Sequence, residues 1–162
     1  MYSQKMNRSP ALIPVFFLVL AVVFMITPSF AADGSHHKHH VAVAGGLARN
    51  NDQSSGYLGV DYVYRFSGPW AAGVFYEEVS GDFDIRAWGL TFGRYFDSGW
   101  KIGAGPGAEY KFKKNKTLAL FHVSGGYDWH MGNWSIGPVA TLDFIEGGEQ
   151  TYYLGMSIGY GF

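Results

Sequence analysis

The chain has 162 residues, no cysteine and a formal net charge of −1, with 18% aromatic residues, 15% charged residues and 23 glycines. An average soluble domain has about 25% charged residues and about 7% glycine. The aromatic content is too high and the charge too low for a disordered chain. The missing cysteines exclude a disulfide framework, and the charge balance gives no reason to expect nucleic-acid binding.

The first 31 residues have the pattern of a secretory signal peptide. Lys5 and Arg8 precede an apolar run over 11–26, which is shorter than the ~20 residues that a membrane-spanning helix needs. Pro28 ends the run, and small residues follow up to Ala31. We predict cleavage near Ala31, with an uncleaved membrane anchor as the alternative. Removing Lys5 and Arg8 leaves 10 basic and 13 acidic residues.

Residues 32–40 are rich in histidine and are predicted to form a periplasmic arm. Clustered neutral imidazoles bind zinc, copper or nickel, although this spacing specifies no coordination geometry. A solvated arm without metal is the alternative. The candidate ligands are His36, His37, His39 and His40.

From residue 41 onward, apolar and small or polar residues alternate in eight segments of about ten residues, a period typical of strands with two different faces. The segments cover 41–47, 58–66, 70–77, 88–93, 100–112, 119–129, 134–144 and 152–162. In the last segment, six large residues from Tyr152 to Phe162 alternate with mostly tiny ones. The large face suits lipid and the small face a crowded lumen. We predict an all-β fold for 41–162, an eight-stranded antiparallel up-and-down transmembrane β-barrel.

Turns and prolines refine this prediction. Tight turns at 67–69, 97–99 and 131–133 each precede a tryptophan, and aromatic residues also end the preceding strands, so we expect an aromatic belt at the periplasmic end. The belt residues are Phe66, Trp70, Tyr95, Phe96, Trp100, Trp129 and Trp134. The connections at 49–56, 78–84, 113–116 and 146–150 are polar and are predicted to face outward. Pro106 and Pro138 cannot donate to a ladder, so we expect a bulge at each.

The C-terminal strand ending in Tyr160-Gly161-Phe162 resembles the signal that the outer-membrane assembly machinery reads. The chain is similar to the outer-membrane-protein-X and opacity-protein group in its strand count, its length and the segments 61–66 and 104–107. The resemblance implies a Gram-negative outer membrane, contact with lipid and lipopolysaccharide, and recognition of Tyr160 and Phe162 by the assembly machinery; we favour a monomer. It implies no activity. The short loops depart from family members that use long protruding loops for adhesion.

Charged and polar residues fall on the predicted inner face, and their signs nearly balance. Because buried charges need partners, we expect an ion-pair network that fills a narrow lumen, with a narrow polar conduit as the alternative. Gly155, Ser157, Gly159 and Gly161 mark the region where we expect room for a small cavity. The predicted inner residues are Asp61, Arg65, Glu77, Lys101, Glu109, Lys111, His122, Asp128 and Asp143.

His122 and Ser124 resemble the His-x-Ser of the barrel family that removes an acyl chain from lipid A. A histidine base beside a serine nucleophile suits ester cleavage. Gly125 stands where that family has asparagine, no acidic residue follows at a matching distance to orient His122, and both side chains are predicted to face inward. We therefore expect a structural or interaction barrel without catalysis or cofactor. The alternatives are a lipid-modifying barrel enzyme, and a transport or metal-handling barrel.

Overall fold

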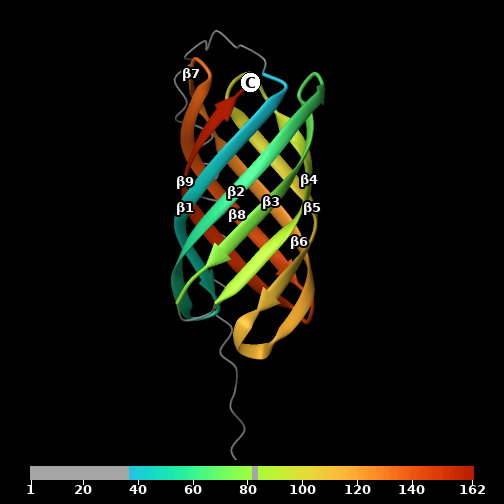
Figure 1. The fold of residues 1–162 in the computed structure, drawn as a ribbon, viewed down its shortest axis with the longest axis vertical. Coiled ribbons are helices and arrows are strands. Elements are labelled where there is room, and N and C mark those ends of the chain that lie inside the picture. Colours follow the sequence, from blue (N-terminus) through green and yellow to red (C-terminus); the bar gives the residue numbers. More distant parts are fainter. Residues whose placement is uncertain (1–36, 82–83) are drawn as a thin grey trace, which may run out of the picture. The chain divides into compact units, whose positions relative to one another are not determined.

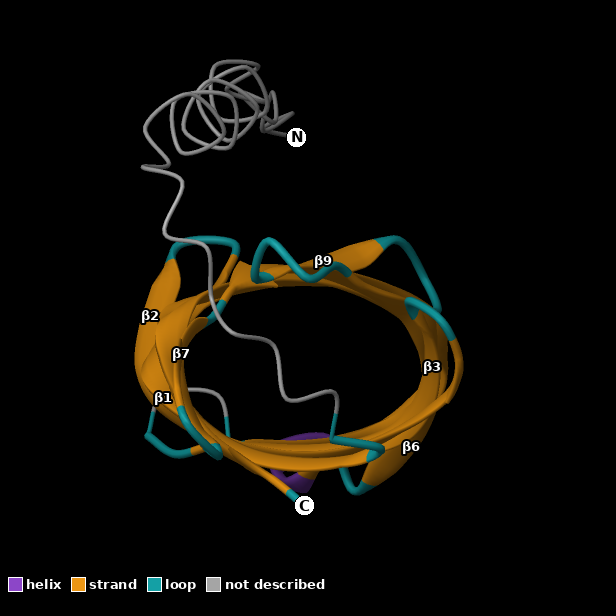
Figure 2. Cartoon of the chain, turned by 90° about the horizontal axis from the view of Figure 1, so that it is seen from above, coloured by secondary structure: helices purple, strands orange, loops and turns teal. Residues whose placement is uncertain are grey.

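The computed structural model describes residues 37–81 and 84–162, and these residues form a closed antiparallel β-barrel (Figure 1). The predicted signal peptide over 1–31 lies outside the described residues. Strands that are neighbours in sequence pair with each other, except that β6 pairs with β8 and not with β7, and β1 pairs with β9 to close the ring (Figure 2). The strands are β1 (His39–Asn50), β2 (Gln53–Ser67), β3 (Trp70–Val79), β4 (Ile85–Tyr95), β5 (Trp100–Lys111), β6 (Lys116–Tyr127), β7 (Trp129–Met131), β8 (Trp134–Ile145) and β9 (Glu149–Gly161). In 37–81 and 84–162 no helix is both long and apolar enough to cross a membrane.

The short β7 continues β6, so the barrel has eight strands as predicted. Both segments pair with β8 in one register, in which Gly126 faces Val139 and Trp129 faces Ile136. Pro138 lies opposite the interruption and has no backbone N–H to donate. The expected bulge at Pro138 is therefore wrong. The ladder loses backbone hydrogen bonds beside Pro138, but its register does not shift.

Pro106 behaves in the same way. Gly89 faces Gly107 on one side of it and Phe92 faces Ala104 on the other, which is again one register. The Pro106 ring lies on the exposed outer face, where it meets no other layer of protein. The expected bulge here is also wrong. Among the described pairings, the one register shift lies between Arg65 and Ser67, beside a tight turn.

The outer face of the barrel is apolar over most of its height. Leu90 and Leu154 expose 59% and 64% of their surface, and their strands alternate between such residues and buried ones. Other large apolar residues exposed on this face are Val43, Leu47, Leu58, Val74, Ile102, Phe121, Met156 and Ile158. A continuous apolar surface of this size is unfavourable in water. The alternation predicted from the sequence therefore separates an apolar exterior from a mixed interior.

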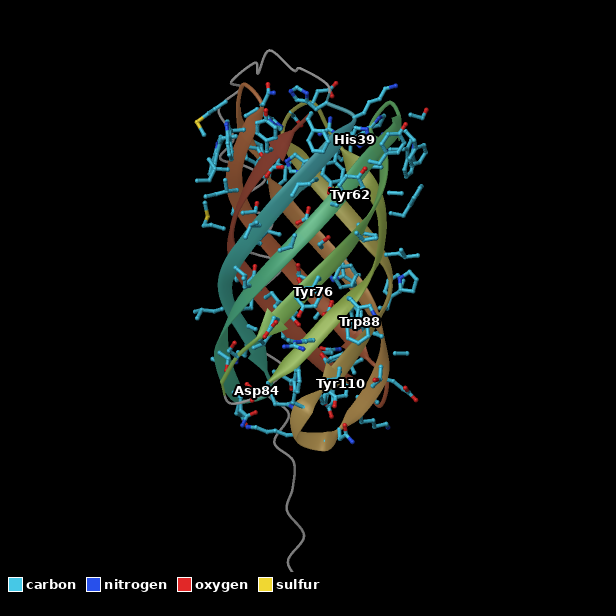
Figure 3. All side chains as sticks on the ribbon, in the orientation of Figure 1. His39, Tyr62, Tyr76, Asp84, Trp88 and Tyr110 are labelled. Atoms are coloured by element: carbon cyan, nitrogen blue, oxygen red, sulfur yellow. The ribbon has the colours of Figure 1, made fainter. Side chains whose placement is uncertain are left out.

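Aromatic rings gather on the exterior at the end where β1 begins and β9 ends. The Trp70 ring stacks on Phe92 with centroids 5.3 Å apart, and Trp134 meets Tyr160 at 5.0 Å. His39 and Tyr62 lie at this end in Figure 3, whereas Tyr110 lies toward the other. Tyr95 does not join the belt, which corrects our expectation: it occupies an inner position of β4, where it borders an interior cavity.

The β1–β2 connection at the opposite end is shorter than predicted. β1 and β2 are joined by two residues alone, with Asn51 in the left-handed region at φ 52°, so most of the expected 49–56 loop is strand. A single 3₁₀ turn, Phe112–Lys114, links β5 to β6. β1 also begins at His39, which places the last two residues of the predicted 32–40 arm inside the barrel wall.

Candidate functional site in the barrel interior

Eight of the nine residues predicted to face inward occupy inner positions of their strands, and the ninth, Asp128, lies between β6 and β7. Six of the nine are buried: Glu77, Glu109, Lys111, His122, Asp128 and Asp143. Asp61 and Lys101 border the interior cavity, and the Arg65 guanidinium lies 5.3 Å from the ring centroid of Tyr95. A strand presents alternate side chains to opposite faces. Once one residue of a strand is assigned to the inner face, the face of every other residue in that strand follows.

The polar residues near the start of β1 and the end of β9 form one cluster, the upper cluster, around Lys101 and Asp128. The Lys101 ammonium donates to Asp128 Oδ1 at 2.9 Å, and the two side chains are 11% and 4% exposed. Asp61 interacts electrostatically with both partners. In the same end of the lumen, the buried His40 ring nitrogen Nε2 hydrogen-bonds with Ser135 Oγ at 3.1 Å.

A second cluster, the lower cluster, occupies the half of the lumen nearer the opposite end. His122 Nδ1 and Asp143 Oδ1 are hydrogen-bonded at 2.9 Å, and these residues face each other directly in the β6–β8 ladder. Phe75 stacks on the His122 ring with centroids 3.9 Å apart. The Lys111 ammonium pairs with Glu109 at 3.4 Å and also with Glu149.

Apolar side chains fill much of the space around the lower cluster. The strand alternation already places Phe75 and Tyr153 on the inner face, but the other residues were missed because the predicted inner set was limited to polar and tiny side chains. Their positions follow the same period of two, so that signal was available. The buried apolar and aromatic residues of this half are Tyr57, Phe75, Val79, Ile85, Leu118, Leu120, Ile145 and Tyr153.

An interior cavity of about 60 Å³ borders both clusters. Residues on its wall include Asp61, Thr91, Lys101, His122 and Ser124. One water needs about 10–15 Å³ of such space, so the cavity has room for a few.

The space beside the β9 glycines is already filled, which corrects our expectation of room there. A Cβ added at Gly155 would lie 2.7 Å from the Tyr57 hydroxyl, and one at Gly159 would meet the His40 ring. At Gly161 it would lie 2.7 Å from the His37 ring. The cavity instead lies at mid-height, where Ser157 is the β9 residue on its wall.

The structure supplies an acidic partner for His122 that we did not find in the sequence. Asp143 lies 21 residues downstream and reaches His122 through strand pairing. Ser124 lies two residues along the same inner face and borders the cavity. A lipid-cleaving site has to open onto the outer, lipid-facing surface, whereas this histidine and this serine both face the interior.

The predicted histidine metal site is not assembled by the described residues. His36 lies outside them. His39 faces outward, where Nδ1 hydrogen-bonds with the Tyr62 hydroxyl at 2.8 Å and the ring stacks on Phe162. His40 faces the interior. Because neighbouring residues of a strand point to opposite faces, His39 and His40 cannot bind one ion together.

The predicted assembly signal lies on the outer face at the closing strand. Tyr160 and Phe162 expose 38% and 56% of their surface. The Phe162 amide donates to the His39 carbonyl at 2.9 Å, and the His39 amide donates to the Phe162 carbonyl at 3.1 Å. The terminal aromatic residue is therefore held beside the first strand.

No protein-family model and no curated protein matches this sequence. Among solved structures, the chain is similar to the N-terminal β-barrel domain of Pseudomonas aeruginosa OprF, with a TM-score of 0.56 and 14% identity over 77% of this chain and 100% of that one. It is also similar to Neisserial surface protein A, with a TM-score of 0.54 and 12% identity over 76% of this chain and 96% of that one. For the Yersinia pestis outer membrane protein Ail in a nanodisc, the TM-score is 0.51 and the identity 15%, over 76% and 99% of the two chains. These similarities confirm the expected resemblance at the level of the fold.

Proposed function

We propose that this chain is a small integral β-barrel protein of a Gram-negative outer membrane, with a structural or interaction role and no catalysis. The observation that carries the proposal is the inverted distribution of polarity. Leu90 and Leu154 are exposed on the exterior, while Glu109 and Asp143 are fully buried inside. A barrel in water favours the reverse, and a barrel in lipid favours this arrangement.

Closure of the ring supports the same conclusion. Lipid offers no hydrogen-bond partners, so a spanning sheet needs every strand edge paired. The β1–β9 ladder runs from His40 to Asn50 and closes the sheet. In this proposal the predicted signal peptide directs export, the tight turns at 67–69, 97–99 and 131–133 face the periplasm, and membrane lipid and lipopolysaccharide surround the barrel.

The proposal of a non-catalytic role rests on the enclosed position of the polar residues in the barrel interior. His122, Asp143 and Ser124 are enclosed by the barrel wall, so an ester bond in the surrounding lipid has no direct contact with them. Phe75 covers one face of the His122 ring. The apolar residues of the lower half fill the lumen below the cavity, which favours a plugged barrel over a conduit.

Folding should depend on lipid. We expect urea-unfolded protein, diluted into phosphatidylcholine vesicles, to acquire the circular dichroism of a β-barrel and to resist added protease. Without lipid it should aggregate or stay unfolded, because its apolar exterior has no partner. A monodisperse, soluble, protease-resistant monomer in plain buffer would refute the membrane proposal.

Removal of Phe162 should reduce assembly in cells. If the terminal aromatic is read by the assembly machinery, deleting it should lower the amount of folded barrel in outer-membrane fractions several-fold. Folding into vesicles separates this role from stability and should change much less. Phe96→Ala removes an exposed aromatic that follows the end of β4, in a turn at the same end of the barrel, and is the control. Equal loss for both variants would contradict a recognition role for Phe162.

A further inference from the structure

Glu77, His122 and Asp143 come together in the lower cluster from three different strands. One potential ligand atom of each lies within 4.8 Å of the others. The three residues are 7%, 4% and 0% exposed. They were predicted only as members of a general ion-pair network, and the structure shows that they converge on one point.

Several polar atoms at this point have no hydrogen-bond partner. These atoms are Glu77 Oε2, Asp143 Oδ2 and the Tyr153 hydroxyl, all on side chains that are at least nine-tenths buried. Tyr153 is not one of the three converging residues, and its hydroxyl makes a side-chain contact with Asp143 and with Glu77 that falls short of a well-formed hydrogen bond. An unsatisfied buried polar group costs about 1–3 kcal/mol, and more when it is charged. A polar or charged ligand between these side chains would therefore satisfy these atoms.

The charges around the cluster indicate which kind of ligand would suit it. Glu77, Asp143 and Glu109 interact with one another electrostatically, as three carboxylates in one buried region. Lys111 is the buried cation beside them, and it divides its contacts between Glu109 and Glu149. Among the described residues, neither Glu77 nor Asp143 contacts a lysine or an arginine, and a protonated His122 would be the one cation that Asp143 contacts. Uncompensated buried charges are strongly unfavourable, and one divalent cation would balance both.

The donor atoms favour a transition metal over Mg²⁺ or Ca²⁺. One imidazole nitrogen with two carboxylate oxygens suits Zn²⁺, whereas Mg²⁺ and Ca²⁺ prefer oxygen ligands throughout. Two ligands of one tetrahedral Zn²⁺ are about 3.3 Å apart. His122 Nδ1 and Asp143 Oδ1 are 2.9 Å apart, so a small separation of this pair suffices. Glu77 and His122 also border the cavity, which has room for a water as a further ligand.

We propose that Glu77, His122 and Asp143 form a divalent metal site inside the barrel, with Zn²⁺ as the best-matched ion. The site is independent of the membrane proposal, since it rests on the interior alone. It also differs from the predicted histidine arm, because none of its ligands comes from residues 32–40. A bound ion would join β3, β6 and β8 through side chains in addition to their ladders.

Titration calorimetry with ZnCl₂ on chelator-treated, detergent-folded protein tests this site. The histidine arm could bind Zn²⁺ separately, so the reference protein carries His36→Ala, His37→Ala and His39→Ala. We expect one Zn²⁺ per chain in this reference, and none after adding His122→Gln or Glu77→Gln. The affinity loss should exceed about 100-fold, the upper range for altering only a ligand's hydrogen-bond partner. MgCl₂ should give no comparable heat.

Thermal unfolding of the same proteins supplies a second measurement. Zn²⁺ should raise the unfolding midpoint of the reference protein and leave that of the His122→Gln and Glu77→Gln proteins unchanged, since only the native state binds. Circular dichroism verifies that both variants fold. Equal Zn²⁺ binding by the reference and the two variants would overturn the site, as would no binding by the reference. In the second case shared protons, not a metal, neutralise the carboxylates.

Discussion

Replacing Lys101 with methionine is expected to lower the free energy of unfolding by about 3–5 kcal/mol, the usual cost of breaking a buried ion pair. The Lys101 ammonium contacts Asp128 at 2.9 Å, and both side chains are nearly inaccessible. Its removal leaves Asp128 and Asp61 near each other without their shared cation. Methionine keeps much of the volume, so the loss reports charge more than packing. Urea unfolding in lipid vesicles, followed by tryptophan fluorescence, measures the change.

The same substitution at an exposed ion pair is the matched control. Lys114 lies 3.5 Å from Glu149 and its side chain is 65% exposed. Exposed pairs contribute about 0.2–1 kcal/mol, so Lys114→Met should have a small effect. The double variant Lys101→Met/Asp128→Asn should lose less than the sum of its two single variants, because the partners are coupled. Additive losses, or an equal effect at Lys114, would show that the upper cluster is not a tight ion pair.

Introducing an arginine at Leu90 should cost about 2–4 kcal/mol, as a charge on the lipid face does at the bilayer midplane. Leu90 is the central residue of β4, faces Val74 across the ladder and exposes 59% of its surface. Nothing in the barrel covers it, so a soluble protein would tolerate the change within about ±0.5 kcal/mol. Reversible unfolding of Leu90→Arg from vesicles measures the difference.

An arginine placed outside the apolar band provides the control for Leu90→Arg. Ser98→Arg places the same side chain in an exposed tight turn, where the charge reaches water and the cost near the interface is about 0–1 kcal/mol. If both arginine variants have the same small effect, the apolar exterior is not in contact with lipid. The comparison thereby tests the membrane proposal without any ligand or activity.

The inner and outer positions of the barrel could be predicted residue by residue. A strand has only two faces, so the alternation through Leu154, Met156 and Ile158 specified the exterior and placed Ser157 inside. The prediction went wrong where a backbone group or a turn, not a side chain, decides the geometry. Pro106 and Pro138 break hydrogen bonds without shifting register. Tyr95 was assigned to the aromatic belt because it ends a strand, whereas the alternation through Leu90, Phe92 and Arg94 places it on the inner side.

For the candidate site, too, one part could be predicted from the sequence and another part could not. The sequence by itself determined that Glu77, His122 and Asp143 face inward, because that depends only on position within each strand. The tertiary structure decided which of these residues meet, since register and strand tilt determine which residues lie opposite each other in the barrel. Asp143 reaches His122 through the β6–β8 pairing, and Glu77 reaches them from β3 across the lumen. Period two is a local property of the chain, whereas convergence on one point is a property of the closed ring.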